Sequence, residues 1–187
     1  MAKRPPGKLR VIGGQWRSRV IEFDAAAGVR PTPDRVRQTL FDWLTPTIQG
    51  ARCLDLFAGS GALGIEALSR GAGHCTFAET GSRQCVLIKA ALLGLKAQQY
   101  DVAMMDGIYF IEQTWHRYGV VFLDPPFGTE LLKRALEELP KVLTPEGSRI
   151  YVEWQSKTPL KLPDGYELVR QKQAGQVSFG LATYRHP

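Results

Sequence analysis

From Arg52 onward, short apolar stretches alternate with segments of helical periodicity. The stretches CLDLF and VVFLD are almost continuously apolar, which is typical of parallel strands that helices cover on both faces. The pattern therefore predicts an α/β protein with a doubly wound, mostly parallel sheet. Strands are expected at Arg52–Phe57, His74–Glu79, Asp101–Met105, Gly119–Asp124 and Arg149–Trp154, and helices at Ala62–Ser69, Ser82–Leu95, Ile108–His116 and Thr129–Leu139.

The N-terminal part of the chain precedes this alternation. Two short strands are expected at Leu9–Ile12 and Val20–Phe23, around a turn at the Gly13-Gly14 pair. A helix follows, with Thr32 as its N-cap and Pro33 in its first turn, and Pro46 and Gly50 are expected to end it.

The C-terminal part also breaks the alternation. Tyr166–Gln171 and Val177–Tyr184 flank an Ala174-Gly175 turn and predict a closing antiparallel hairpin. We therefore expect a disordered basic tail over residues 1–8, an extension of hairpin and helix over 9–50, and the main domain over 51–187.

Positive charge is concentrated in the first 40 residues. They hold nine basic and three acidic side chains, so this segment carries the whole net charge of +6. A basic segment on an otherwise balanced chain favours a polyanionic partner such as a nucleic acid, because neutralising phosphates releases counterions. A solubilising tail is the alternative.

The remaining composition argues against several classes of protein. Cys53, Cys75 and Cys85 form no CxxC pair, which favours a reducing cytoplasm and disfavours a structural zinc site, so no metal is expected. No apolar run approaches the ~20 residues of a membrane span. The basic N-terminus is followed by no apolar signal region, so no membrane or secretory role is expected.

A glycine-rich loop connects the first predicted strand of the main domain to a helix. Gly59 and Gly61 allow a sharp turn and close approach of a ligand to the backbone, and the following helix offers free N–H groups. Ligands of doubly wound folds bind at this end of the strands. A simple tight turn is the alternative. The predicted cofactor-binding residues here are Asp55, Phe57, Ala58, Gly59, Ser60 and Gly61.

Two further carboxylates follow the next strands. Glu79 is placed to accept hydrogen bonds from both ribose hydroxyls of a nucleotide. Asp106 is placed either to accept from an adenine amine or to cap the next helix. Up to this point a nicotinamide dinucleotide and S-adenosylmethionine both remain open as the cofactor.

The sequence DPPF after the fourth strand decides between them. Pro125 and Pro126 lack N–H groups and fix the backbone, so the Pro125 carbonyl is a rigid free acceptor beside the Asp124 carboxylate. Phe127 adds a ring on which a base can stack. Two acceptors aimed at an aromatic amine make its nitrogen more tetrahedral and nucleophilic toward a sulfonium methyl group, chemistry that a nicotinamide enzyme does not need. Asp124, Pro125, Pro126 and Phe127 are the predicted catalytic residues.

These motifs together resemble the RsmD-like family of bacterial 16S rRNA guanine-N2 methyltransferases, which are class I S-adenosylmethionine-dependent enzymes. Two departures are Phe127, where the family commonly has Tyr, and Asp42, where it often has Asn. The resemblance is carried by Arg10–Arg17, Arg30–Thr32, Val36–Leu44, Asp55–Gly61, Glu66–Ala72 and Asp124–Phe127.

The resemblance implies a Rossmann-like sheet of seven strands with one reversed strand. It implies S-adenosylmethionine as cofactor, a flipped guanine at Asp124–Phe127, and 16S rRNA, within a 30S subunit or assembly intermediate, as partner of a monomer. An adenine-N6 methyltransferase acting on DNA or RNA, and a non-catalytic RNA-binding assembly factor, remain alternatives. The implied RNA-contacting residues are Arg10, Arg17, Arg19, Arg30, Thr32, Arg35 and Arg37.

Overall fold

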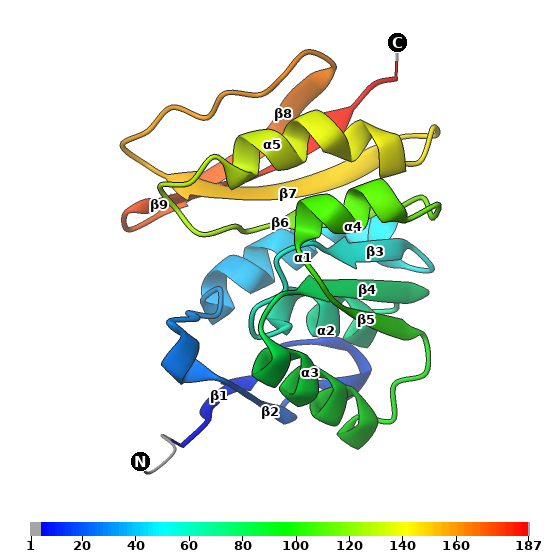
Figure 1. Ribbon diagram of the computed structural model, residues 1–187, viewed down its shortest axis with the longest axis vertical. Helices are drawn as coiled ribbons and strands as arrows, with labels where there is room; N and C mark the ends of the chain where they lie inside the picture. Colours follow the sequence, from blue (N-terminus) through cyan, green and yellow to red (C-terminus); the bar gives the residue numbers. More distant parts are fainter. Residues whose placement is uncertain (1–4, 187) are drawn as a thin grey trace.

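The computed structural model describes residues 5–186 and is built around one seven-stranded sheet (Figure 1). Its strand order is β5-β4-β3-β6-β7-β9-β8. Strand β9 runs in the opposite direction to the other six strands of this sheet. The predicted doubly wound sheet with one reversed strand is confirmed. The strands are β3 (Arg52–Asp55), β4 (His74–Glu79), β5 (Tyr100–Met104), β6 (Val120–Leu123), β7 (Ser148–Gln155), β8 (Tyr166–Ala174) and β9 (Val177–Tyr184).

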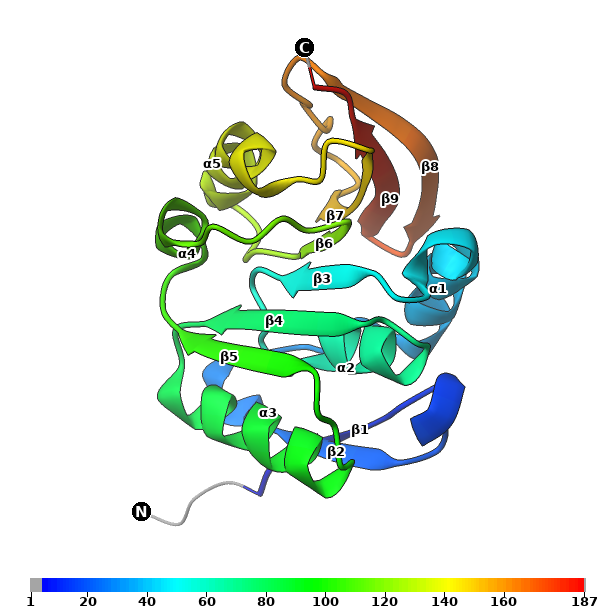
Figure 2. The same cartoon turned by 90° about the vertical axis from the view of Figure 1, so that its right-hand side faces the viewer.

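Helices cover both faces of this sheet, as Figure 2 shows most clearly for α1 and α2 on one side and α4 and α5 on the other. Helices α1, α2 and α3 pack into one apolar cluster, and α4 and α5 into the other. Within residues 5–186, no helix has the length and apolar character that crossing a bilayer requires. The helices are α1 (Asp34–Ile48), α2 (Ala62–Ser69), α3 (Ser82–Gly94), α4 (Gly107–Gln113) and α5 (Leu131–Glu138).

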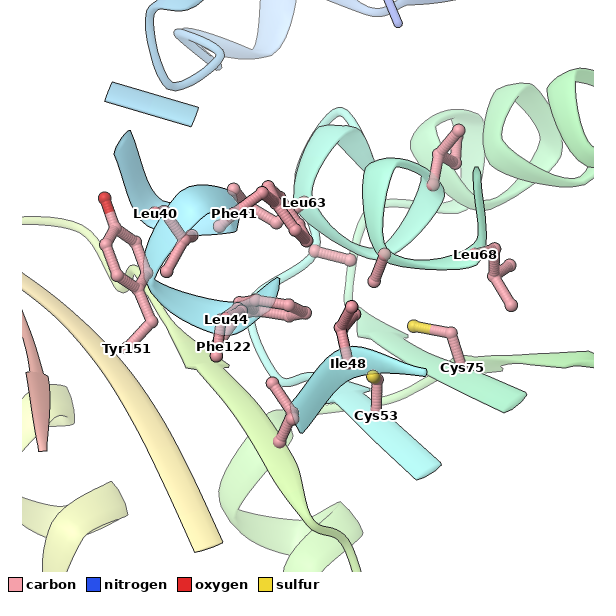
Figure 3. Close-up of a cluster of buried hydrophobic side chains, with 14 of the residues drawn as sticks. Leu40, Phe41, Leu44, Ile48, Cys53, Leu63, Leu68, Cys75, Phe122 and Tyr151 are labelled. Atoms are coloured by element: carbon pink, nitrogen blue, oxygen red, sulfur yellow. The ribbon is translucent and has the colours of Figure 1, made fainter. Parts of the chain in front are cut away.

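Helix α1 forms much of the first cluster because its apolar residues recur at helical spacing. Leu40, Phe41, Leu44 and Ile48 share one face of α1, and Figure 3 shows them turned toward the sheet and α2. The ring of Phe41 lies 5.9 Å from that of Phe122 on β6. Burying each such side chain stabilises the fold by about 1.5–3 kcal/mol.

We expected Pro46 and Gly50 to end helix α1. The helix instead passes through Pro46 and ends at Ile48, two residues before Gly50. Proline removes one backbone donor, yet threonine hydroxyls bond carbonyls in the same turns. Thr45 donates to the carbonyl of Phe41 at 3.0 Å, and Thr47 donates to that of Leu44 at 3.1 Å. Pro46 is tolerated because it lies in the last turn of the helix, where its missing N–H removes only one intrahelical hydrogen bond.

The N-terminal extension is a two-stranded antiparallel sheet, β1 (Gly7–Arg10) and β2 (Val20–Phe23), which lies against α2 and α3 (Figure 2). The predicted disordered tail is wrong at residues 7 and 8, because Gly7 pairs with Phe23, whose ring covers the space that a side chain at Gly7 would need. Residues 1–4 lie outside the described part of the chain. Between the strands, residues 14–16 form a 3₁₀ helix, η1, instead of a simple glycine turn.

A buried carboxylate on α2 attaches this extension to the main sheet. Glu66 is fully buried and accepts the N–H groups of Ile12 at 2.9 Å and Gly13 at 2.8 Å. The Nε of Arg70 donates to Glu66 at 2.8 Å, and Arg37 forms an ion pair with it at 3.5 Å. The extension is therefore docked through charge-assisted hydrogen bonds and not only through apolar contact.

Arg37 was expected to contact RNA, and the structure corrects this. Its side chain is 1% exposed, donates to the Arg10 carbonyl at 2.9 Å and is paired with Asp34 and Glu66. A guanidinium held this way cannot reach a phosphate. The sequence pattern counted its charge correctly but could not reveal that the buried Glu66 and the exposed Asp34 already neutralise it.

Candidate active site

The main cavity lies where the strand order reverses, between β3 and β6. Loops that follow parallel strands on either side of such a point diverge and leave a crevice at the carboxyl ends of the strands. The cavity has a volume of about 720 Å³. Its walls come from residues 28–32 of the N-terminal extension, 55–60 after β3, 78–81 after β4, 105–107 after β5 and 124–127 after β6.

The glycine loop is held open by carboxylates at the ends of neighbouring strands. Glu79 accepts the N–H of Gly59 at 2.8 Å and that of Gly81 at 2.7 Å. Asp55 accepts the N–H of Gly64 at 3.0 Å, which fixes the start of α2. Gly61 has φ +75° and does not line the cavity, so its contribution is to the turn and not to direct contact with a ligand.

Asp55 sits at the floor of the cavity as a buried acid. The pKa of Asp55 is raised to about 7, mainly by burial; the Gly64 hydrogen bond opposes the rise and the charge of Glu79 adds to it. When burial raises the pKa of a carboxyl group, a nearby positive charge stabilises its ionised form. A cationic ligand bound near Asp55 would therefore be attracted by its carboxylate.

Asp106 caps α4 and also lines the cavity. Its Oδ1 accepts the N–H groups of Ile108 at 2.9 Å and Tyr109 at 3.0 Å, so one of the two interpretations left open by the sequence, the helix cap, is confirmed. The second remains a prediction, because a carboxylate has further acceptor capacity and Asp106 lies in the cavity wall.

The corner formed by Asp124–Phe127 is the wall opposite the glycine loop. Within the described residues, no hydrogen bond reaches the Asp124 carboxylate or the Pro125 carbonyl, so both acceptors are available to a ligand. Burial raises the pKa of Asp124, and the nearby carboxylates of Glu153 and Asp55 raise it further. Phe127 is 42% exposed, as a ring intended for stacking must be.

A strap over residues 28–32 lies across the cavity between the two walls. Val29 lies close to Gly59 of the glycine loop, and Arg30 is exposed and lines the cavity. We expected Thr32 to be the N-cap of α1, but the N-cap is Pro33. Thr32 is buried, and its hydroxyl donates to Glu153 at 3.2 Å, a contact across 121 residues that the local pattern could not reveal.

Two cavity residues were missed by sequence reasoning. Gln84, at the start of α3, lines the cavity and exchanges two hydrogen bonds with the backbone of Asp24, at 2.9 and 3.1 Å. Glu153 lies next to Asp124 and accepts from Tyr151 at 2.6 Å. Glu153 lies inside β7, two residues before its end, so the pattern of acids at strand ends does not mark it, and nothing local marks Gln84.

A second cavity, of about 860 Å³, lies behind the same corner. Pro125, Pro126 and Phe127 line both cavities, while Glu153 and Trp154 belong to the second. The corner therefore borders both spaces, one lined by the glycine loop and one lined by the last residues of β7.

The other predicted RNA-contacting arginines lie on the surface. Arg10, Arg17, Arg19 and Arg35 are exposed on the extension and the start of α1, and Arg19 also donates to the Gly94 carbonyl at 3.2 Å. The three cysteines are buried and unpaired. Among residues 5–186, no group of three or more His, Cys, Asp or Glu side chains is arranged to hold a metal ion.

The charge of the main cavity supports S-adenosylmethionine, the cofactor that the DPPF motif favoured over a nicotinamide dinucleotide. Four carboxylates line it, those of Asp55, Glu79, Asp106 and Asp124, against the single cation of Arg30. Such a lining fits the positively charged S-adenosylmethionine and repels the diphosphate of a nicotinamide dinucleotide. The glycine loop would hold the amino acid part, and Glu79 and Asp106 the adenosine.

The strand order, the glycine loop after the first parallel strand and the acidic cavity at the switch point define a class I methyltransferase. The comparisons narrow this class. A family model described as "Conserved hypothetical protein 95" matches residues 9–183. The chain belongs to this RsmD-like family of S-adenosylmethionine-dependent methyltransferases.

Named relatives are similar in sequence to this protein over nearly the whole chain. The ribosomal RNA small subunit methyltransferase D of Escherichia coli is 42% identical, over 94% of this chain and 89% of its own length. The protein of the same name from Haemophilus influenzae is 41% identical, over 94% and 93%. A solved structure of the yhhF protein of Escherichia coli covers 97% of this chain and 100% of its own, with 40% identity and a TM-score of 0.89.

Proposed function

We propose that this chain transfers a methyl group to the exocyclic N2 of a guanine in small-subunit rRNA. One observation carries the proposal: the free acceptors of Asp124 and Pro125 face the same cavity as the glycine loop. An amine held by these acceptors would meet a methyl donor in that cavity. The names of the relatives support rRNA as the substrate, and the exposed arginines of the extension provide charge for its phosphates.

The residues of the corner have separate tasks in this proposal. The target base leaves its stack, at a cost of a few kcal/mol, and the ring of Phe127 offsets part of that cost. The two N–H groups of the amine donate to the Asp124 carboxylate and the Pro125 carbonyl, which directs the nitrogen lone pair into the cavity. S-adenosylmethionine supplies an electrophilic methyl group when bound.

Asp124 also accepts a proton in this scheme. Methylation leaves the amine nitrogen positively charged, and one N–H proton must depart. Because burial and neighbouring carboxylates raise the pKa of Asp124, it binds a proton more readily than an exposed aspartate does. The same carboxylate thus orients the amine before transfer and neutralises the product afterwards.

The test is a transfer assay with a radiolabelled methyl donor, offering naked 16S rRNA and 30S particles from a strain that lacks the enzyme. Nuclease digestion of the product is expected to release N2-methylguanosine. Asp124→Ala is expected to abolish transfer while calorimetry still detects binding of the methyl donor. Asp42→Ala, which removes an exposed acid from α1, is the matched control and is expected to retain activity.

Three outcomes would contradict the proposal. Recovery of N6-methyladenosine would identify an adenine methyltransferase. Failure of the wild-type protein to bind the methyl donor would indicate a non-catalytic RNA-binding factor. Loss of donor binding in a folded Asp124→Ala variant would show that Asp124 holds the cofactor and not the target amine.

A further inference from the structure

Glu153 stands beside Asp124 at the carboxyl ends of two adjacent parallel strands. Leu123, the last residue of β6, pairs with Val152 on β7. Asp124 and Glu153 directly follow this last pair, and the charge of Glu153 acts on the Asp124 carboxyl. Glu153 is 7% exposed. A glutamate is therefore buried next to the residue that is proposed to hold the target amine.

The two oxygens of Glu153 are used unequally. Oε1 accepts from the Tyr151 hydroxyl at 2.6 Å and from the Thr32 hydroxyl at 3.2 Å. Among residues 5–186, no hydrogen bond reaches Oε2. Within the described residues, the fully buried side-chain polar atoms that lack a partner belong to Arg37 and His74, so Oε2 of Glu153 is open to solvent and can accept a hydrogen bond. Glu153 lines the second cavity together with Pro125 and Phe127, so a base stacked on Phe127 could supply the donor.

Guanine and adenine differ beside their exocyclic amines. In guanine the ring nitrogen next to the amine, N1, carries a hydrogen and is a donor, whereas in adenine N1 next to the amine is an acceptor. A carboxylate beside the amine-binding corner accepts from the first and repels the second. A carboxylate in this place can therefore distinguish the two bases by a single hydrogen.

We propose that Glu153 accepts the N1–H of the target guanine and so selects guanine over adenine at the Asp124–Phe127 corner. This inference rests on the proposed guanine-N2 methylation. Glu153 would be a specificity-determining residue that touches the substrate. Tyr151 and Thr32 would be positioning residues, because their hydroxyls fix Oε1 and leave Oε2 facing the base.

Glu153→Gln tests the inference with little change of shape. Tyr151 and Thr32 both donate hydrogen bonds, so they are expected to hold the amide oxygen in the place of Oε1 and leave the amide NH₂ facing the base. That NH₂ opposes the N1–H of guanine. It matches 2-aminopurine, which keeps the reactive amine but has a lone pair at N1.

The experiment compares methyl transfer to 30S particles that carry either guanosine or 2-aminopurine riboside at the methylated position, once product mapping has located it. Wild type is expected to prefer guanosine by kcat/KM. Glu153→Gln is expected to lower kcat/KM on guanosine by about 10- to 100-fold and to shift the preference toward 2-aminopurine by at least that factor. Glu146→Gln, the same change at an exposed position that lines neither cavity, is expected to keep the wild-type preference.

Folding is checked by thermal unfolding and by binding of the methyl donor. If Glu153→Gln does not fold, Glu153→Asp takes its place; its shorter carboxylate is expected to slow transfer to guanosine without any gain on 2-aminopurine. An unchanged preference in a folded Glu153→Gln, a gain on 2-aminopurine with Glu153→Asp, or a wild-type preference for 2-aminopurine would overturn the inference. Absence of N2-methylguanosine from wild-type reactions would instead refute the proposed function.

Discussion

The buried Glu66 carboxylate offers a strong test of how the N-terminal extension is held. Glu66→Gln keeps the size of the side chain but removes its charge and turns one acceptor oxygen into a donor. The NH₂ would face either the Ile12 N–H or the Gly13 and Arg70 donors, so at least one buried donor would lose its partner. The charge of Arg37 would also lose one of its two carboxylates.

The expected change in the free energy of unfolding follows from these contacts. A hydrogen bond to a charged group contributes about 1.5–3 kcal/mol, and removing one partner of a buried ion pair costs about 3–5 kcal/mol. Because the same carboxylate makes all of these contacts, the costs are not additive. We expect Glu66→Gln to lower the free energy of unfolding by about 3–5 kcal/mol.

The assay is urea-induced unfolding followed by far-UV circular dichroism. Glu112→Gln, the same change at an exposed position of α4, is the matched control and is expected to alter the free energy of unfolding by less than about 0.5 kcal/mol. A loss below about 1 kcal/mol for Glu66→Gln would refute the reasoning, because it would mean that the network contributes no more than an exposed ion pair.

Three other predictions address the cavity and the extension. Gly61→Ala is expected to destabilise the fold by about 1–2 kcal/mol, because φ is +75° at Gly61. It is also expected to weaken binding of the methyl donor in calorimetry. The control Gly94→Ala, in open space on α3, is expected to stabilise the fold slightly. Asp55 has a folded-state pKa of about 7 against an ordinary 3.8, so the folded state binds the extra proton between these values. Wild-type stability should therefore fall relative to Asp55→Asn as the pH rises from about 4 to about 7, and parallel thermal unfolding curves would contradict this. Replacing Arg17 and Arg19 by Ala is expected to reduce the salt dependence of 16S rRNA binding by about one to two counterions in filter-binding titrations, and an unchanged slope would place the RNA elsewhere.

The parallel sheet was predictable because its signals are local. A strand buried on both faces must be almost continuously apolar, and a ligand loop at a strand end needs glycine where the backbone turns. The acids that follow the strands, Asp55, Glu79, Asp106 and Asp124, could be assigned to one cavity for the same reason, since parallel strands bring their carboxyl ends to one edge.

Other residues of the site depend on contacts between distant parts of the chain. The sequence pattern treats Arg37 as one more cation in a basic segment, yet its side chain is buried and paired with Glu66 and Asp34. Thr32 fits the pattern of a helix cap, yet its hydroxyl bonds Glu153, 121 residues away. Gln84 has no local signal, because its function is to hold the backbone of Asp24.

The amino-acid order alone predicted the class of fold, the loop proposed to receive the cofactor and the corner proposed to receive an amine, because each depends on backbone conformation and apolar periodicity within a few consecutive residues. The tertiary structure alone decided which charges remain available to a partner and which carboxylate stands beside the reactive one. Those properties depend on burial, and burial is set by strand pairing and helix packing across the whole chain.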